Sequence, residues 1–254
     1  NLTFKINFAA PFTLNEYLQP SAYDWVILPD EICYNKKQAR PCFVFDYGNY
    51  PYDIKQQAFW AKKFFMEKYK QIHVYTNMVI AEKEYAALFK ELFKPVPELE
   101  TLIDHHVNIL GGGGAFISVA FIFLKLLGDF RETDDSSTVL PDAERKALIN
   151  KCMEHLKEIY NENDCAKVLV TSDSVSFLEE AKKLPFVYII PGDISHIDAC
   201  QNTGNDVNLK LFLDYFVLSY SKKVYLVIED QMYNSGFSYR AALLNNVPFI
   251  VKKY

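Results

Sequence analysis

A glycine flanked by serines stands where a strand gives way to a helix. The run from Val224 to Ile228 is rich in β-branched and other apolar residues and predicts a strand, and Phe237 to Asn245 predicts a helix. Free N–H groups, hydroxyls and the positive end of a helix suit a pyrophosphate, and Arg240 adds a forked cation. A capped helix with a surface arginine is the alternative. We predict a phosphate site with Arg240 in a catalytic role, built from Ser235, Gly236, Phe237 and Ser238.

Asp214 is a carboxylate within the apolar run from Leu211 to Leu218. A desolvated charge there needs a partner or donors from a ligand. Guanine offers two adjacent donors, N1–H and N2–H, to one carboxylate. The alternative is an i, i+4 pair with Lys210 on a solvated face. The residues alone leave both interpretations open.

Small polar residues follow a second predicted strand, Val168 to Thr171. Ser172, Asp173 and Ser174 could grip sugar or ribose hydroxyls, and the same residues form an ordinary helix N-cap. His196, in the loop after Pro191 to Asp193, could contact a bound ligand. The adjacent His105 and His106 point to different sides of a helix and predict no metal site.

Strands alternate with helices along the second half of the chain, which predicts an α/β fold with a parallel sheet covered by helices. Ligands bind such sheets at the carboxyl ends of the strands. The four glycines Gly111 to Gly114 are interpreted as a linker, with a phosphate cradle as the alternative. We therefore expect two Rossmann-like lobes: an amino-terminal lobe over 1–110, with its start missing, and a nucleotide-binding lobe over 111–254.

The composition limits the function classes. The net charge of -5 argues against a nucleic-acid partner. Five scattered cysteines show no metal spacing and predict reduced thiols in a cytoplasmic protein. The sequence has no long apolar run, so we expect no transmembrane segment, while peripheral membrane association stays open. The chain begins at Asn1, and we expect it to lie inside a longer product.

Taken together, these segments resemble the GDP-fucose-dependent glycosyltransferases. The resemblance spans about Phe93 to Phe249 and rests on the order and spacing of five weak motifs. They are Leu92 to Pro95, the strand at Phe116 to Phe121, Thr171 to Ser174, an Asp-containing helix ending at Ser219 to Lys222, and Ser235 to Ala242. It implies a GT-B architecture and inverting transfer of fucose from GDP-fucose, or another nucleotide sugar, to a glycan or glycoconjugate hydroxyl, without a required metal or other cofactor. It also implies that Asp214 binds guanine and that Ser235 to Ser238 with Arg240 hold the pyrophosphate.

The resemblance also assigns roles to the remaining candidates. The lobe over 1–110 would be the acceptor side and the lobe over 111–254 the nucleotide-sugar side, and His196 could contact donor or acceptor. Inverting transfer needs a base near the acceptor, for which Asp173, Asp129 and a carboxylate of the amino-terminal lobe are candidates. Asp173 is the predicted catalytic carboxylate.

Two departures from the family count against activity. The glycine-rich motif that opens the amino-terminal lobe of these enzymes is absent, as expected if the start of the lobe is missing. The first donor-lobe strand of these enzymes carries a His-x-Arg signature, whereas this chain reads Val119-Ala120-Phe121-Ile122-Phe123. Loss of such an arginine weakens stabilisation of the leaving phosphate. The leading hypothesis is a glycosyltransferase. A noncatalytic nucleotide-sugar or glycan-binding protein, and a pure interaction module, are the alternatives.

Overall fold

The computed structural model describes residues 3–8, 12–44, 59, 62–63, 68–76, 82–129, 139–194 and 205–254. The chain forms two compact units. Unit 1 comprises Asn1–Asn7 and Ala22–Leu92, and unit 2 comprises Phe8–Ser21 and Phe93–Tyr254. The division of the structure therefore falls before the glycine run. The assignment of 1–110 and 111–254 to acceptor and donor lobes remains a prediction.

Unit 1 contains a short parallel pair of strands. β2 (Ala39–Val44) pairs with β3 (Gln71–Thr76), and α2 (Glu82–Leu92) follows. The apolar run over 24–28 predicts a strand but contributes only a single bridge, between Ile6 and Val26. The amphipathic pattern over 54–70 predicts a helix that lies largely outside the described residues.

An early segment of the chain belongs to unit 2. The 3-10 turn η1 (Leu14–Glu16) leads into β1 (Leu18–Pro20), which pairs antiparallel with β4 (Phe93–Pro95). The Tyr17 ring stacks on Phe212 with 4.7 Å between centroids, and Phe12 meets the same ring edge-on. Aromatic packing therefore brings residues 12–20 into unit 2, far along the chain from their partners.

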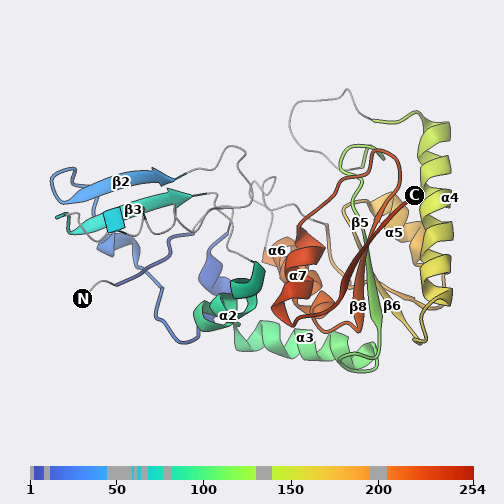
Figure 1. The fold of residues 1–254 in the computed structure, drawn as a ribbon, viewed down its shortest axis with the longest axis horizontal. Coiled ribbons are helices and arrows are strands. Elements are labelled where there is room, and N and C mark those ends of the chain that lie inside the picture. Colours follow the sequence, from blue (N-terminus) through green and yellow to red (C-terminus); the bar gives the residue numbers. More distant parts are fainter. Residues whose placement is uncertain are drawn as a thin grey trace. The chain divides into compact units, whose positions relative to one another are not determined.

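The core of unit 2 is a five-stranded parallel sheet in the order β7-β6-β5-β8-β9. Its strands are β5 (Ile117–Phe121), β6 (Val168–Ser172), β7 (Val187–Tyr188), β8 (Lys223–Ile228) and β9 (Phe249–Lys253). Its helices are α4 (Asp142–Asn161) and α5 (Val175–Ala181) on one face, with α6 (Asn205–Leu218) and α7 (Phe237–Leu244) on the other (Figure 1). The predicted α/β class, with a helix-covered parallel sheet, is confirmed.

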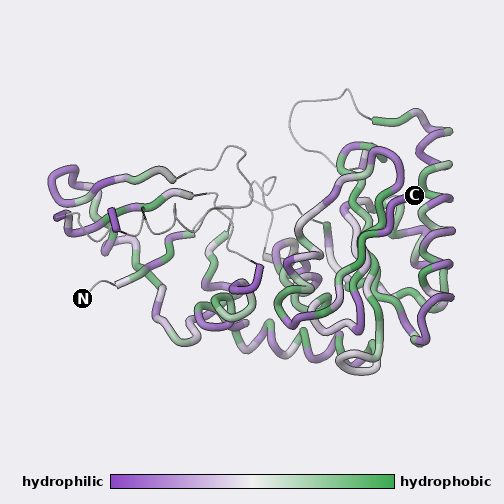
Figure 2. The backbone as a smooth tube through the Cα atoms, in the orientation of Figure 1, coloured by the Kyte–Doolittle hydropathy of each residue, from purple (hydrophilic) through white to green (hydrophobic). Residues whose placement is uncertain are grey.

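Burial on both faces explains the composition of the strands. All five residues of β5 are buried, and Figure 2 shows the central strands as a continuous hydrophobic band. On α4, the buried residues Leu148, Cys152, Leu156 and Ile159 recur at helical spacing while lysines and glutamates face outward. Such near-continuous apolar strands are typical of parallel sheets covered twice.

The glycine run is a turn inside unit 2. It joins α3 (Pro97–Ile109) to β5, with Gly111 and Gly112 at φ 97° and 99°, backbone angles that favour glycine. The Gly112 N–H donates to the Val107 carbonyl and the Gly114 N–H to the Tyr220 carbonyl. The turn thus ends the helix and lies at the amino end of β5, opposite to the end where ligands bind.

The buried face of α4 yields a stability prediction. Leu156 is fully buried, so Leu156→Ala should lower the free energy of unfolding by about 2–5 kcal/mol, from lost burial and the cavity left behind. Its exposed neighbour provides the control, because Lys157→Ala should change stability by no more than about 0.5 kcal/mol. Urea unfolding of both variants is the measurement. Equal stability of the two would contradict the assigned core.

Candidate functional site

A pocket of ≈ 380 Å³ lies in unit 2 where the strands of the sheet end. Its described lining residues are Ile122, Thr171, Ser172, Asp173, Asp193, Ile194, Lys210, Leu211, Asp214, Tyr233, Ser235, Gly236 and Phe237. They end β6, follow β5, β6, β7 and β8, or belong to α6 and the start of α7. The strand order reverses between β5 and β8, and such a switch point is the usual ligand site of an open α/β sheet.

A larger hollow of ≈ 530 Å³ runs beside α4 and is lined by Leu126, Leu140, Glu144, Ala147, Leu148, Lys151, Asp230 and Gln231. None of the residues singled out in the sequence lies there. Its cation is already engaged, because Lys151 Nζ bonds Glu229 at 2.6 Å. The pocket at the strand ends is therefore the candidate site.

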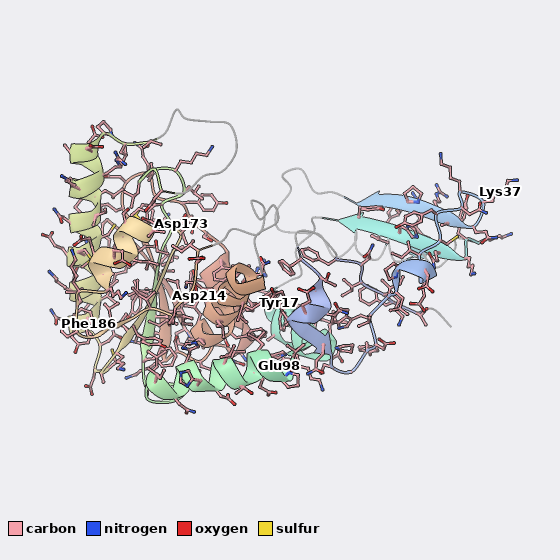
Figure 3. All side chains as sticks on the ribbon, turned by 180° about the vertical axis from the view of Figure 1, so that it is seen from behind. Tyr17, Lys37, Glu98, Asp173, Phe186 and Asp214 are labelled. Carbon is pink, nitrogen blue, oxygen red and sulfur yellow. The ribbon has the colours of Figure 1, made fainter. Side chains whose placement is uncertain are left out.

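Asp173 binds the loop that follows β5. Its Oδ1 accepts the Phe123 N–H at 2.8 Å and its Oδ2 accepts the Leu124 N–H at 2.7 Å. Leu124 has φ 50°, a left-handed conformation that is costly for a branched side chain. The carboxylate thus holds a strained turn at the edge of the pocket. Figure 3 labels Asp173, directly after β6, and Asp214, on α6.

Burial governs the charge state of Asp173. Its pKa is raised above the usual value chiefly by desolvation, and Asp129 raises it further, while the N–H groups of Phe123 and Leu124 act in the opposite direction. With both oxygens engaged by backbone, this side chain is well placed to position the loop. Its assignment as the catalytic base remains a prediction.

Ser174 forms the helix cap that was one of the two interpretations of its segment. Its Oγ accepts the Phe177 N–H at 3.1 Å and donates to Asp129 Oδ2 at 2.9 Å. Asp129 also accepts the N–H of Ser176 at 2.7 Å. Ser174 does not line the pocket, whereas Ser172 and Thr171 do. Thr171 is 5% exposed, and its hydroxyl has no hydrogen-bond partner among the described residues.

The turn before α7 opens onto the pocket. Ser235, Gly236 and Phe237 line it, and a Cβ added at Gly236 would meet nothing within 4 Å. No side chain caps the helix at Gly236, and the N–H of Phe237 donates to Ser235 Oγ at 3.2 Å. The positive end of the helix therefore faces the pocket beside Ser235. Ser238 is 1% exposed and lies outside the lining, with an unpartnered hydroxyl among the described residues.

Arg240 is not among the residues that line the pocket. Its guanidinium carbon lies 5.9 Å from the ring centre of Tyr239, and its carbonyl accepts the Tyr215 hydroxyl at 3.3 Å. A pyrophosphate in this pocket would therefore meet the N–H groups of the turn before the arginine. The role predicted for Arg240 stays a prediction.

Asp214 combines the two interpretations that the sequence left open. The pair with Lys210 is present, with Lys210 Nζ 2.7 Å from Asp214 Oδ2. Its surroundings are not a solvated face, because the side chains are only 4% and 13% exposed. Burial raises the pKa of Asp214 and the charge of Lys210 opposes that shift. Asp214 Oδ1 is buried without a partner among the described residues, so it remains an unused acceptor.

The charges around the pocket restrict its ligands. Three aspartates (Asp173, Asp193, Asp214) and one lysine (Lys210) are the charged side chains in the described lining. An anionic diphosphate would be repelled by the aspartates unless it lay at the start of α7, where the helix end is positive. Lys210, Asp193 and Tyr233 were not predicted as site residues, although Lys210 was weighed as a partner of Asp214. Each of them lies within four residues of a predicted position: Lys210 near Asp214, Asp193 near His196 and Tyr233 near Ser235. This proximity is the sequence feature that could have identified them.

Several predictions fall on features that the structure does not place. His196 lies outside the described residues. Within the part of the chain that the structure describes, no three His, Cys, Asp or Glu side chains converge as a metal site. No described helix combines the length and apolarity needed to cross a membrane.

No protein-family model and no curated protein matches the chain. Among solved structures, it is similar to NodZ alpha-1,6-fucosyltransferase soaked with GDP-fucose, at 15% identity and a TM-score of 0.48, over 77% of this chain and 59% of the other. The chain is also similar to fucosyltransferase NodZ from Bradyrhizobium, at 15% identity and a TM-score of 0.48. A variant of Arabidopsis thaliana FUT1 in complex with GDP matches at 15% identity and a TM-score of 0.49, over 93% and 61%.

A third similar structure is POFUT1 in complex with GDP-fucose, at 12% identity and a TM-score of 0.48, over 100% and 88% of the two chains. The chain spans about three fifths of the NodZ and FUT1 chains.

The position of Asp173 leads to a prediction about loop stability. Asp173→Ala removes the acceptor of two N–H groups and should lower the free energy of unfolding by about 1–3 kcal/mol. Asp193→Ala is the matched control, because this aspartate lines the same pocket but is exposed and should cost no more than about 0.5 kcal/mol. Thermal unfolding compares them, and hydrogen exchange at Leu124 locates the effect. An unchanged exchange rate would refute the clamp.

Proposed function

We propose that unit 2 binds the nucleotide portion of a nucleotide sugar and that the chain is a glycosyltransferase. The observation that carries the proposal is the pocket itself. It joins three separately predicted segments, the end of β6, the helix α6 and the start of α7, at the switch point of a parallel sheet. GDP-fucose is the donor that the sequence resemblance implies.

In this proposal, each part of the nucleotide sugar contacts a different set of residues that line the pocket. The diphosphate lies on the N–H groups at the start of α7, beside Ser235 and Gly236. Guanine lies against α6, where Asp214 supplies acceptors. The hydroxyls of Thr171 and Ser172 bind sugar or ribose hydroxyls, which would give the buried Thr171 Oγ1 a partner.

In the proposed reaction, an acceptor hydroxyl of a glycan or glycoconjugate attacks the anomeric carbon of the donor while GDP leaves. The helix end stabilises the charge that develops on the leaving phosphate. A base must take the proton of the acceptor hydroxyl. Asp173 is the predicted base, although its two oxygens already accept backbone N–H groups.

A noncatalytic nucleotide-sugar-binding protein is the second candidate. The observation in its favour is β5, whose Val119, Ala120 and Phe121 are at most 1% exposed and belong to the hydrophobic core. No side chain of this strand can therefore supply the His-x-Arg groups of the resembled family. GDP binding without turnover of GDP-fucose, tested with a panel of glycan acceptors, would favour this candidate over the enzyme.

Gly236 provides a direct test of ligand binding. Because its surroundings are open and its φ of -79° suits any residue, Gly236→Val should leave the fold intact while filling the space before α7. We expect GDP affinity to fall about tenfold or more, the effect of losing about 1.4 kcal/mol or more of binding free energy. Calorimetric titration measures the affinity and urea unfolding checks the fold.

The control for this variant is another glycine in unit 2. Gly113→Ala adds a Cβ at ordinary contact distance from Tyr220, 3.6 Å, at the opposite end of β5, and GDP affinity should be unchanged. If GDP binds native protein and Gly236→Val equally well, the site is elsewhere. If GDP and GDP-fucose do not bind the native chain at all, the proposed function fails.

Asp214 predicts a pH dependence of base binding. Only the ionised carboxylate can accept both guanine donors, so guanosine affinity should fall as pH decreases through the pKa of Asp214. Burial raises that pKa, so the loss should begin at a higher pH than for an ordinary aspartate. Guanosine avoids titration of a phosphate. Titrations of native protein and Asp214→Asn between about pH 4 and 8 span the usual carboxyl range and its raised extension; identical profiles for the two proteins would exclude Asp214.

A further inference from the structure

Lys210 lies one helical turn before Asp214 on α6, and both side chains line the candidate pocket. Its side chain is 4% exposed, and Nζ lies 2.7 Å from Asp214 Oδ2. Lysines are almost never buried unless they are paired. This ammonium group is therefore fixed at the wall of the pocket, whereas the ammonium group of a surface lysine would move freely.

Gly192 holds the stem of this lysine in place. The residue has φ +128°, and a Cβ there would lie 3.1 Å from Lys210 Cβ and 3.3 Å from Cδ. The backbone after β7 therefore passes directly against the aliphatic chain of Lys210. With the stem packed and Nζ bonded to Asp214, the direction of the ammonium group is determined before any ligand arrives.

The pair presents a defined hydrogen-bond pattern. An ammonium group has three donors, and Asp214 accepts one of them. Asp214 Oδ1 is buried and unpartnered among the described residues. The wall of the pocket therefore offers a donor next to carboxylate acceptors.

Guanine has the complementary edge, with the O6 acceptor beside the N1–H and N2–H donors. Adenine and cytosine carry an amino donor at the position of O6. Uracil matches at O4 and N3–H but sets the O2 acceptor against the carboxylate. Among the common bases, guanine alone satisfies all three positions.

We propose that Lys210 donates to O6 of guanine while Asp214 accepts N1–H and N2–H, so that base specificity depends on the pair. This inference rests on the proposed function, since it names the second specificity-determining residue of the same site. The competing role for Lys210 is to bind the diphosphate. The pairing with Asp214 disfavours that role, because the carboxylate offsets most of its attraction for an anion.

The test uses Asp214→Asn as its background, which avoids leaving a buried carboxylate unpaired when Lys210 is changed. An asparagine amide accepts N1–H and donates to O2, the pattern of xanthine, while O6 remains opposite Lys210. We expect native protein to prefer GDP over xanthosine diphosphate and Asp214→Asn to prefer xanthosine diphosphate, each by about tenfold or more, as the exchange of one matched for one mismatched buried hydrogen bond implies.

Lys210→Met in this background then isolates the lysine. We expect the affinities for xanthosine and for xanthosine diphosphate to fall by the same factor, about fivefold or more, because O6 is common to both ligands. Lys210→Arg should retain part of the affinity, since it keeps a donor. Calorimetry supplies the affinities, and thermal unfolding confirms that every variant is folded.

The remaining outcomes separate the alternatives. A loss for xanthosine diphosphate but not for xanthosine would make Lys210 a phosphate ligand and overturn the inference. Equal affinities with and without Lys210 would make the pair purely structural, and the inference would be wrong in that case too. If native protein binds GDP but Asp214→Asn shows no switch, the proposed function survives and the base-reading pair does not. If native protein binds no nucleoside diphosphate, the proposed function itself fails.

Discussion

The all-parallel sheet of unit 2 is the constraint on which the site depends. Every connection between parallel strands must cross a face of the sheet, so α4 to α7 cover both faces and leave the strand ends as the accessible edge. β5 lies in the middle of this arrangement and is buried at every residue. A ligand therefore meets the strand ends, the segments that follow them and α6, and the reversal of strand order beside β5 separates these parts enough to form the pocket.

The three aspartates that line this pocket differ in their burial and in their hydrogen-bond partners, and therefore in their roles. Asp173 gives both oxygens to backbone N–H groups and holds the turn at Leu124. Asp214 gives one oxygen to Lys210 and keeps the other unpaired among the described groups. Asp193 is exposed. Desolvation raises the pKa of both Asp173 and Asp214, yet only Asp214 retains an acceptor that a ligand could use.

The proposed nucleotide site differs from the resembled family in how it would manage phosphate charge. An apolar β5 has no room for a His-x-Arg pair, because its side chains fill the core of the sheet. Lys210 is committed to Asp214, and Arg240 lies outside the pocket lining. Within the described residues, the start of α7 is then the main electropositive feature facing the ligand. The positive helix end is sufficient to bind a phosphate. Catalysis would require the same helix end to stabilise the charge that develops on the leaving phosphate.

The sequence by itself determined the five strands of the parallel sheet and the helices α4 to α7, because hydrophobic period and turn chemistry are local properties. The parallel sheet, the turn at Ser235 to Phe237 and the cap at Ser174 were all predictable in this way. Other features required the tertiary structure, because they depend on residues far apart in the chain. Residues 8–21 join unit 2 through aromatic contacts with α6, and the glycine run is a turn within that unit. The environment of Lys210 and Asp214 could not be predicted either, since their spacing fixes the pair but only packing against Gly192 and the pocket decides whether water screens it.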